Sequence, residues 1–141
     1  MDKEFGSSLL GDNQVGWDWF SLQLDDGEEL MLYVLRNPDG AVDHASGTRV
    51  LADGSVQYFD QRAWTIDVEE RWQSESGGHY PVAWTVRVAG RTLRIRAHFF
   101  DQENRGTLIS DLAYWEGAVE ILDDQGARLG QGFVEMTGYG E

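Results

Sequence analysis

Cysteine is absent from this sequence of 141 residues, and proline occurs only twice. Without cysteine, the chain has no disulfide framework, no thiolate nucleophile and no cysteine-bound zinc. Basic residues are also scarce: 11 Lys and Arg stand against 25 Asp and Glu, so the formal net charge is −14. Binding to nucleic-acid phosphates or to an anionic membrane surface requires a basic patch. We therefore expect no nucleic-acid partner.

Long hydrophobic runs are missing as well. The longest uninterrupted apolar run covers residues 30–35, whereas a membrane-spanning helix needs about 20 apolar residues. Residues 1–5 carry charged side chains where a signal peptide would have an apolar core. The sequence thus predicts no membrane insertion and leaves the cellular compartment undetermined.

The usual motifs of catalysis and cofactor binding are also absent. The chain has no phosphate-binding loop, no Gly-x-Ser-x-Gly elbow and no closely spaced pair of histidines. Gly130-Gln131-Gly132 matches part of a dinucleotide fingerprint, but residues typical of a strand follow it. We interpret these glycines as allowing a strand to bend or to approach another strand. No cofactor and no metal site is predicted.

Turn signals and β-forming residues dominate what remains. Asp-Gly pairs at residues 26–27, 39–40 and 53–54 are typical of hairpin tips. The runs between turns are rich in aromatic and β-branched residues, and residues 91–99 alternate between apolar and polar side chains. No stretch has a helical period with a cap. The pattern predicts an all-β fold, an antiparallel barrel or sandwich of about eight to ten strands.

The length suits a single domain. Residues 1–13 mix charged residues with Gly and Ser, a composition that favours turns. We expect these residues to form an N-terminal arm and residues 14–141 to form one barrel domain.

The aromatic stretch at residues 14–24 is the first candidate for a binding site. As a strand, it places Trp17, Trp19 and Gln23 on one face and Asp18 on the other. Aromatic rings with polar neighbours line many small-molecule pockets. Equally, the tryptophans can simply fill the core, with Asp18 bonded to nearby backbone.

Two carboxylates and one histidine are candidates for proton transfer. Glu116 and Glu135 each lie among aromatic and apolar neighbours, where burial would raise the carboxyl pKa as in general acids. The alternation of a strand equally allows either side chain to project outward. His98, beside two phenylalanines, is the histidine best placed for proton transfer, although a single strand histidine is more often structural.

Several stretches together resemble a known family over essentially the whole chain. The most specific is Trp-Asp-Trp-Phe within residues 14–24, and further matches lie at residues 1–8, 46–48, 80–84, 114–117 and 135–139. These stretches are similar to the C-terminal lipocalin-like domain of the carotenoid 1,2-hydratase and predicted secreted hydrolase superfamily. Fungal Diels–Alderases that close decalin rings are more distantly similar.

The resemblance implies a lipocalin-like (calycin-type) antiparallel β-barrel with an apolar pocket. Members of this family usually carry two such domains in tandem, and this chain looks like the second. The implied partner is a second lipocalin-like domain or, in its place, another copy of the chain in a homodimer. Relatives are often exported.

Two motifs differ from those suspected to matter in carotenoid hydration. Lys3 stands where relatives often carry His or Arg, and Phe5 stands where they often carry Trp. In the second motif, Tyr33 is not followed by an Asp two residues later. These differences count against carotenoid hydration by this chain. No nucleophile–base pair that would support a hydrolase is visible either.

Three functions are compatible with these observations. The first is a barrel that binds a small apolar ligand (a polyene, a terpenoid or a polyketide-like molecule) in an aromatic-lined cavity. The second is an enzyme that uses this cavity for acid-assisted hydration, isomerisation or pericyclic cyclisation, with Glu116, Glu135 and His98 as catalytic candidates. The third is a non-catalytic half of a two-barrel protein. The residues expected to line the cavity are Trp17, Trp19, Gln23, Tyr33, Trp84 and Tyr114.

Overall fold

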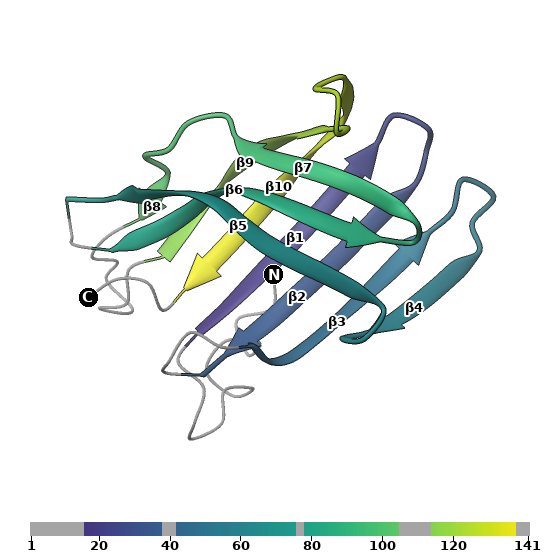
Figure 1. Ribbon diagram of the computed structural model, residues 1–141, viewed down its shortest axis with the longest axis horizontal. Helices are drawn as coiled ribbons and strands as arrows, with labels where there is room; N and C mark the ends of the chain where they lie inside the picture. Colours follow the sequence, from purple (N-terminus) through teal and green to yellow (C-terminus); the bar gives the residue numbers. More distant parts are fainter. Residues whose placement is uncertain (1–15, 38–41, 76–77, 105–113, 138–141) are drawn as a thin grey trace.

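The chain folds into β-strands throughout the computed structural model, which describes residues 16–37, 42–75, 78–104 and 114–137 (Figure 1). Within these residues no helix is long and apolar enough to cross a membrane. The predicted all-β fold of eight to ten strands is confirmed, whereas the expected arm at residues 1–13 lies outside the described residues. The strands are β1 (Gly16–Leu24), β2 (Glu29–Arg36), β3 (Val42–Val50), β4 (Val56–Asp60), β5 (Trp64–Gln73), β6 (His79–Val88), β7 (Arg91–Ala97), β8 (Glu103–Asn104), β9 (Tyr114–Leu122) and β10 (Arg128–Thr137).

All the strands belong to one antiparallel sheet that curls over on itself. Its order is β4-β3-β2-β1-β10-β9-β7-β6-β5, and β8 pairs with β9 beside this path. Figure 1 shows β5, β6 and β7 crossing in front of β1 and β2. The sheet therefore forms a half-barrel whose two edges are β4 and β5.

Tight turns at glycine connect several of these strands, as the Asp-Gly pairs predict. Gly27 and Gly54 have φ values of 95° and 91°, a conformation that costs glycine little because it has no Cβ. In the second turn, the Ser55 hydroxyl and backbone N–H donate to Asp53 Oδ1 at 2.6 and 2.9 Å. These hydrogen bonds lower the pKa of the Asp53 carboxyl.

The core fills the inner face of the half-barrel, which is the side toward which the sheet curls. Along β1, Phe20, Leu22 and Leu24 point to this face and are at most 5% exposed. Phe20 meets Trp84 of β6 edge to face, with ring centroids 5.3 Å apart. Because β10, β9 and β7 separate β1 from β6 in the sheet, this contact spans the interior rather than two neighbouring strands. Side chains thus pack the middle of the half-barrel.

An ion pair lies on the inner face near the first residues of β1. Asp18 Oδ2 is 3.3 Å from Arg36 Nε, and both side chains are nearly buried. Arg36 Nη2 also donates to the backbone oxygen of Thr137 at the end of β10. The guanidinium therefore links β2 to both β1 and β10, and it supplies Asp18 with the partner that a buried carboxylate requires.

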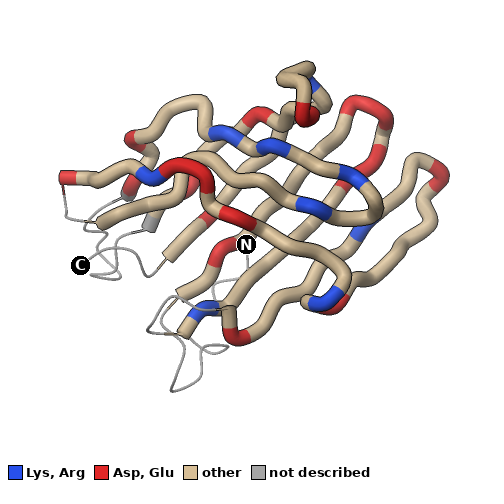
Figure 2. Tube along the Cα trace, viewed as in Figure 1, with Lys and Arg blue, Asp and Glu red and all other residues tan. Residues whose placement is uncertain are grey.

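Charged residues of both signs cover the outer face of β5, β6 and β7. Figure 2 shows acidic residues along β5 and basic residues along β7. Arg96 Nη1 lies 2.9 Å from Glu70 Oε1, and Arg87 Nη1 lies 3.3 Å from Asp67 Oδ2. This part of the outer face is a solvated, charged surface. The outer face of β1, β2, β9 and β10 has a different composition.

Candidate functional site

The two tryptophans of β1 lie on the outer face of the sheet. Trp17 and Trp19 are partly exposed. The residues that alternate with them, Asp18 and Phe20, are buried on the inner face. In the strand register, Trp19 stands opposite Tyr33 of β2 on one side and opposite Glu135 of β10 on the other. Side chains opposite each other have Cβ atoms about 4.5–5.5 Å apart and interact.

Glu135 in turn stands opposite Glu116 of β9. Burial raises the pKa of the Glu135 carboxyl, and the nearby charge of Glu116 raises it further. Two carboxylates this close cannot both ionise without repulsion. We call the four residues Glu116, Glu135, Trp19 and Tyr33 the carboxylate–aromatic row. It runs across β9, β10, β1 and β2 on one face, and it combines a carboxyl of raised pKa with aromatic surface.

Further aromatic and apolar side chains lie next to the carboxylate–aromatic row. The Tyr33 ring lies 5.9 Å from the His44 ring on β3, measured between centroids. Exposed Met31 and Phe133 share the outer face, because both stand opposite Ser21 of β1 in the register. Phe133 is 40% exposed and Met31 50%. Exposed apolar side chains of this kind are rarer on the charged face of β5–β7, and they suit contact with a binding partner.

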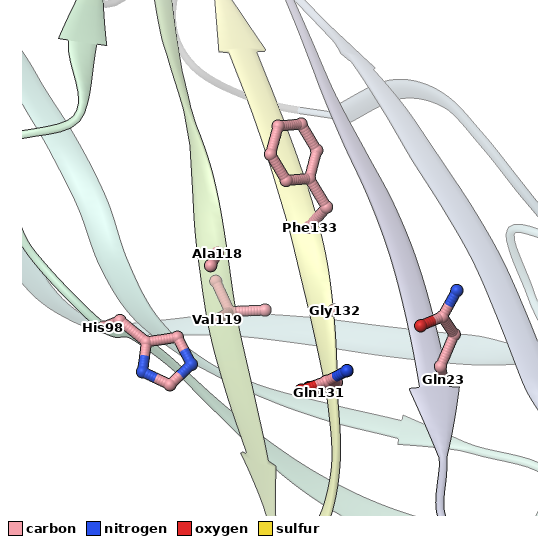
Figure 3. Close-up of a pocket in the computed structure, with 7 residues that line it drawn as sticks. All are labelled: Gln23, His98, Ala118, Val119, Gln131, Gly132 and Phe133. Atoms are coloured by element: carbon pink, nitrogen blue, oxygen red, sulfur yellow. The ribbon is translucent and has the colours of Figure 1, made fainter.

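A small pocket of about 250 Å³ lies on the same outer face, next to the row. Gln23, Gln131 and Phe133 line it from β1 and β10, and His98 borders it from the end of β7 (Figure 3). The His98 backbone N–H donates to Ala118 O at 3.0 Å, which fixes the histidine beside β9. Figure 3 shows the His98 ring and the Gln23 amide on opposite sides of the pocket.

The structure brings most of the predicted site residues onto one face but does not bring them into one cavity. Trp17, Trp19, Gln23, Tyr33, Glu116, Glu135 and His98 all belong to the outer face of the half-barrel. Trp84, in contrast, is 1% exposed and packs in the core on the inner face. Alternation along a strand makes these two faces exclusive, so a single interior cavity does not contain all of these residues. The side chain of Tyr114 lies outside the described part of the structure. The role of each residue in binding or catalysis stays a prediction.

Sequence reasoning missed the neighbours that only the register supplies. Met31 and Phe133 enlarge the apolar surface around the row, and Arg36 neutralises Asp18. The period-2 pattern shows which residues share a face of one strand, but it carries no information on which residues lie opposite them. No group of three or more metal-ligating side chains occurs within the described ranges.

The ten-stranded curled antiparallel sheet is a lipocalin-like fold. The chain belongs to the AttH-like family, whose profile matches residues 1–139. The resemblance predicted from the sequence is thereby confirmed.

Solved structures similar to the chain include the following two. An AttH-type protein from Nitrosomonas europaea is 33% identical, with a TM-score of 0.85, and the match covers 94% of this chain and 41% of that one. Kievitone hydratase from Nectria haematococca shares the fold, with a TM-score of 0.67 and 17% identity over 88% of this chain and 39% of that one. This chain thus spans about two fifths of either protein. Among curated proteins, none matches the sequence.

Proposed function

We propose that this lipocalin-like domain binds a small apolar ligand on its outer face, at the carboxylate–aromatic row. The observation that carries the proposal is the alignment of Trp19 and Tyr33 with Glu135 across three neighbouring strands. Two aromatic side chains offer a large apolar contact area at a low cost in conformational entropy, and a neighbouring acid fixes orientation. The net charge of −14 disfavours anionic ligands.

The row forms one wall of the binding site, and a second lipocalin-like barrel forms the other. Small-molecule sites bury most of the ligand surface, which an open outer face does not do alone. The two similar structures are more than twice as long as this chain, so they contain additional protein that such a face can contact. In the absence of a linked second domain, another copy of this chain supplies the second wall.

The ligand proposal is tested with limonene, a neutral terpenoid hydrocarbon. Limonene is volatile, so its loss from the headspace above a protein solution measures binding without using tryptophan as the probe. Trp19→Val is expected to weaken binding about thirtyfold, because truncating a central aromatic contact costs about 2 kcal/mol. Tyr58→Val is the matched control, since Tyr58 is an aromatic residue 79% exposed on β4, and the strands β2 and β3 separate β4 from β1. Equal affinities of the two variants would contradict the proposal.

A second candidate function is acid-assisted hydration of an alkene at the same row. The raised pKa of Glu135 favours this function, because a carboxyl with a raised pKa is protonated more often at a given pH than an ordinary one and can act as a general acid. The similar fold of a hydratase is consistent with it. Glu135 would donate its proton to one alkene carbon, leaving a carbocation that the face of Trp19 stabilises. Water would then attack the cation and return a proton to the Glu135 carboxylate, and this regenerates the acid.

Hydration is tested by incubating the protein with limonene in heavy water. A terpene alcohol carrying one carbon-bound deuterium is the expected product, and Glu135→Gln is expected to abolish it. Glu29→Gln is the control, because Glu29 stands opposite the neutral Gln23 rather than another carboxylate. Limonene binding without any product would leave binding as the function and exclude limonene hydration.

A further inference from the structure

The small pocket beside the carboxylate–aromatic row has a polar lining that the proposed function does not use. Gln23 and Gln131 line it together with Phe133, Ala118 and His98 (Figure 3). Its volume of about 250 Å³ lies just below the usual range of about 300–1,000 Å³ for small-molecule sites. A pocket of this size holds a single ring rather than an extended molecule. We call it the amide pocket.

The amide pocket is hollow because a small residue stands between two larger ones. Ala118 of β9 stands opposite Phe133 of β10, and on its other side its backbone oxygen accepts a hydrogen bond from the His98 N–H. Figure 3 shows the rings of Phe133 and His98 face-on, and the Phe133 side is open to solvent because this residue is 40% exposed. The face of an aromatic ring carries partial negative charge, which attracts the polarised C–H groups on the flat side of a sugar ring.

Two neighbouring amides supply hydrogen bonds beside this aromatic face. Gln23 and Gln131 stand opposite each other on β1 and β10. Arg128 Nη2 donates to Gln131 Oε1 at 3.3 Å, which leaves the amide N–H groups of Gln131 for a ligand. An amide is both a donor and an acceptor, and so is a hydroxyl group. Adjacent amides therefore match adjacent hydroxyl groups.

Carboxylates flank the two amides on both sides and select against anions. Glu29 of β2 stands on one side and Glu120 of β9 on the other. An ionised carboxylate only accepts hydrogen bonds, so it suits a hydroxyl donor and repels a phosphate or an acid. Arg96, opposite Glu120 on β7, is already paired with Glu70. A sugar phosphate or a sugar acid is therefore disfavoured.

We propose that the amide pocket binds one ring of a neutral sugar. The flat side of the ring packs on Phe133, and two adjacent hydroxyl groups exchange hydrogen bonds with Gln23 and Gln131. The site does not depend on the apolar ligand proposed for the carboxylate–aromatic row. The two sites take different probes, because limonene has no hydroxyl group.

The test titrates the wild-type chain with the methyl pyranosides of glucose, galactose and mannose, at low protein concentration and low salt so that copies do not associate. In a ¹H–¹⁵N spectrum, at least one of the three is expected to shift the side-chain amide signals of Gln23 and Gln131. The signal of Gln73, an exposed glutamine on β5 that does not line the pocket, should stay in place. Unchanged signals of Gln23 and Gln131 with all three sugars would overturn the proposal.

A matched probe shows whether the hydroxyl groups are recognised. 2-Methoxytetrahydropyran has the ring and the methoxy group of the methyl pyranosides but no hydroxyl group. It is expected to bind about thirtyfold more weakly than the best of the three sugars, the factor that two neutral hydrogen bonds supply. Equal binding of this ether would overturn the proposal, because the ring alone would then be recognised.

A pair of exposed substitutions tests the amides directly. Gln131→Leu keeps the approximate size of the side chain and removes its hydrogen bonds, so it is expected to weaken sugar binding about fivefold. Gln73→Leu is the matched control and should leave sugar binding unchanged, because Gln73 is also an exposed glutamine on a strand. Limonene binding should be the same in both variants. Unchanged sugar binding in Gln131→Leu would contradict the role of this amide.

Discussion

Glu135 and Asp18 lie on adjacent strands and on opposite faces of the sheet, and they show two outcomes for a carboxylate. Asp18 is buried on the inner face and lies 3.3 Å from the Arg36 guanidinium. Glu135 is partly buried on the outer face beside another carboxylate, and burial together with that charge raises its pKa. The first carboxylate has a cationic partner that compensates its charge, and the second binds a proton more readily than an ordinary carboxylate. Only the second is suited to give up a proton.

The raised pKa of Glu135 predicts how its removal changes stability with pH. A carboxyl with a higher pKa in the folded state than in the unfolded state stabilises the fold when protonated, and this contribution disappears as pH rises through the folded pKa. Glu135→Gln mimics the protonated form. At pH 7 it is expected to raise Tm by about 2 °C, which corresponds to about 0.5 kcal/mol. The gain should vanish below about pH 4, where the wild-type carboxyl is protonated as well.

Thermal unfolding followed by circular dichroism at pH 7 and pH 4 measures this effect. Glu29→Gln serves as the control, because it removes the same charge without a carboxylate opposite it. A lower Tm for Glu135→Gln at pH 7 would show that the charged form of Glu135 stabilises the fold.

The contact of Phe20 with Trp84 predicts a large loss of stability on truncation. Phe20 is fully buried and meets a ring from across the half-barrel. Phe20→Ala is expected to cost about 3–5 kcal/mol in the free energy of unfolding, measured by urea denaturation. Phe99→Ala, at a site 72% exposed, is expected to change it by less than about 0.5 kcal/mol. A loss below about 1 kcal/mol at Phe20 would indicate that the interior is not packed.

At the scale of elements, β10 depends on two glycines that let it approach β1. A Cβ at Gly130 would overlap the backbone oxygen of Gln23, and a Cβ at Gly132 would lie 2.5 Å from the backbone oxygen of Ser21. In both cases the obstacle is backbone, which a side-chain rotation cannot relieve. The interpretation of Gly130-Gln131-Gly132 as a strand that closely approaches another is confirmed.

This close approach predicts that a single added methyl group separates the two strands. Gly130→Ala is expected to lower the free energy of unfolding by about 1–3 kcal/mol, the usual cost of inserting an atom into a packed site. Gln131→Ala, the neighbouring exposed residue, is the control and is expected to change it little. Urea denaturation of both variants measures the difference. An equal or higher stability of Gly130→Ala would contradict the register of β1 and β10.

The existence of the strands could be predicted from the sequence, but which strands pair with each other in the sheet could not. Alternation in residues 91–99 and Asp-Gly turns depend on local chemistry, so β7 and the hairpin tips were visible in advance. The partners of Trp19 come from residues 33 and 135, one of which is 116 positions away along the chain. Which face of β1 becomes the core depends on the curl of the whole sheet. The stretch around Trp19 has aromatic or apolar residues on both faces, so the sequence alone is compatible with either face being buried.

At the scale of the whole molecule, the two faces of the curled sheet differ in kind. The inner face is a packed core, and the outer face of β1, β2, β9 and β10 mixes aromatic and apolar side chains with carboxylates and amides. The outer face of β5–β7 is covered by charged pairs instead. A surface of this asymmetry suits a protein that packs one side against a second barrel.

This asymmetry predicts self-association that depends on salt. Two copies that meet through the outer face each carry a net charge of −14, and the resulting repulsion is screened as ionic strength rises. Light scattering at high protein concentration is expected to give a mass that increases toward that of a dimer when salt is added. Phe133→Lys, on the outer face of β10, should prevent the increase. Phe99→Lys is the control and should not prevent it, because Phe99 is also exposed but does not belong to β1, β2, β9 or β10. A monomeric mass under all conditions would exclude the homodimer.

The most direct test of a ligand-binding site on the outer face is a ¹H–¹⁵N spectrum of the indole N–H groups during a limonene titration. The six tryptophans give six separate signals at known places in the fold. A ligand bound on the outer face is expected to shift the Trp19 signal and to leave in place the signals of Trp84 and Trp115, which are buried on the inner face. A shift confined to the inner-face tryptophans would place the ligand inside the half-barrel and contradict a binding site on its outer face.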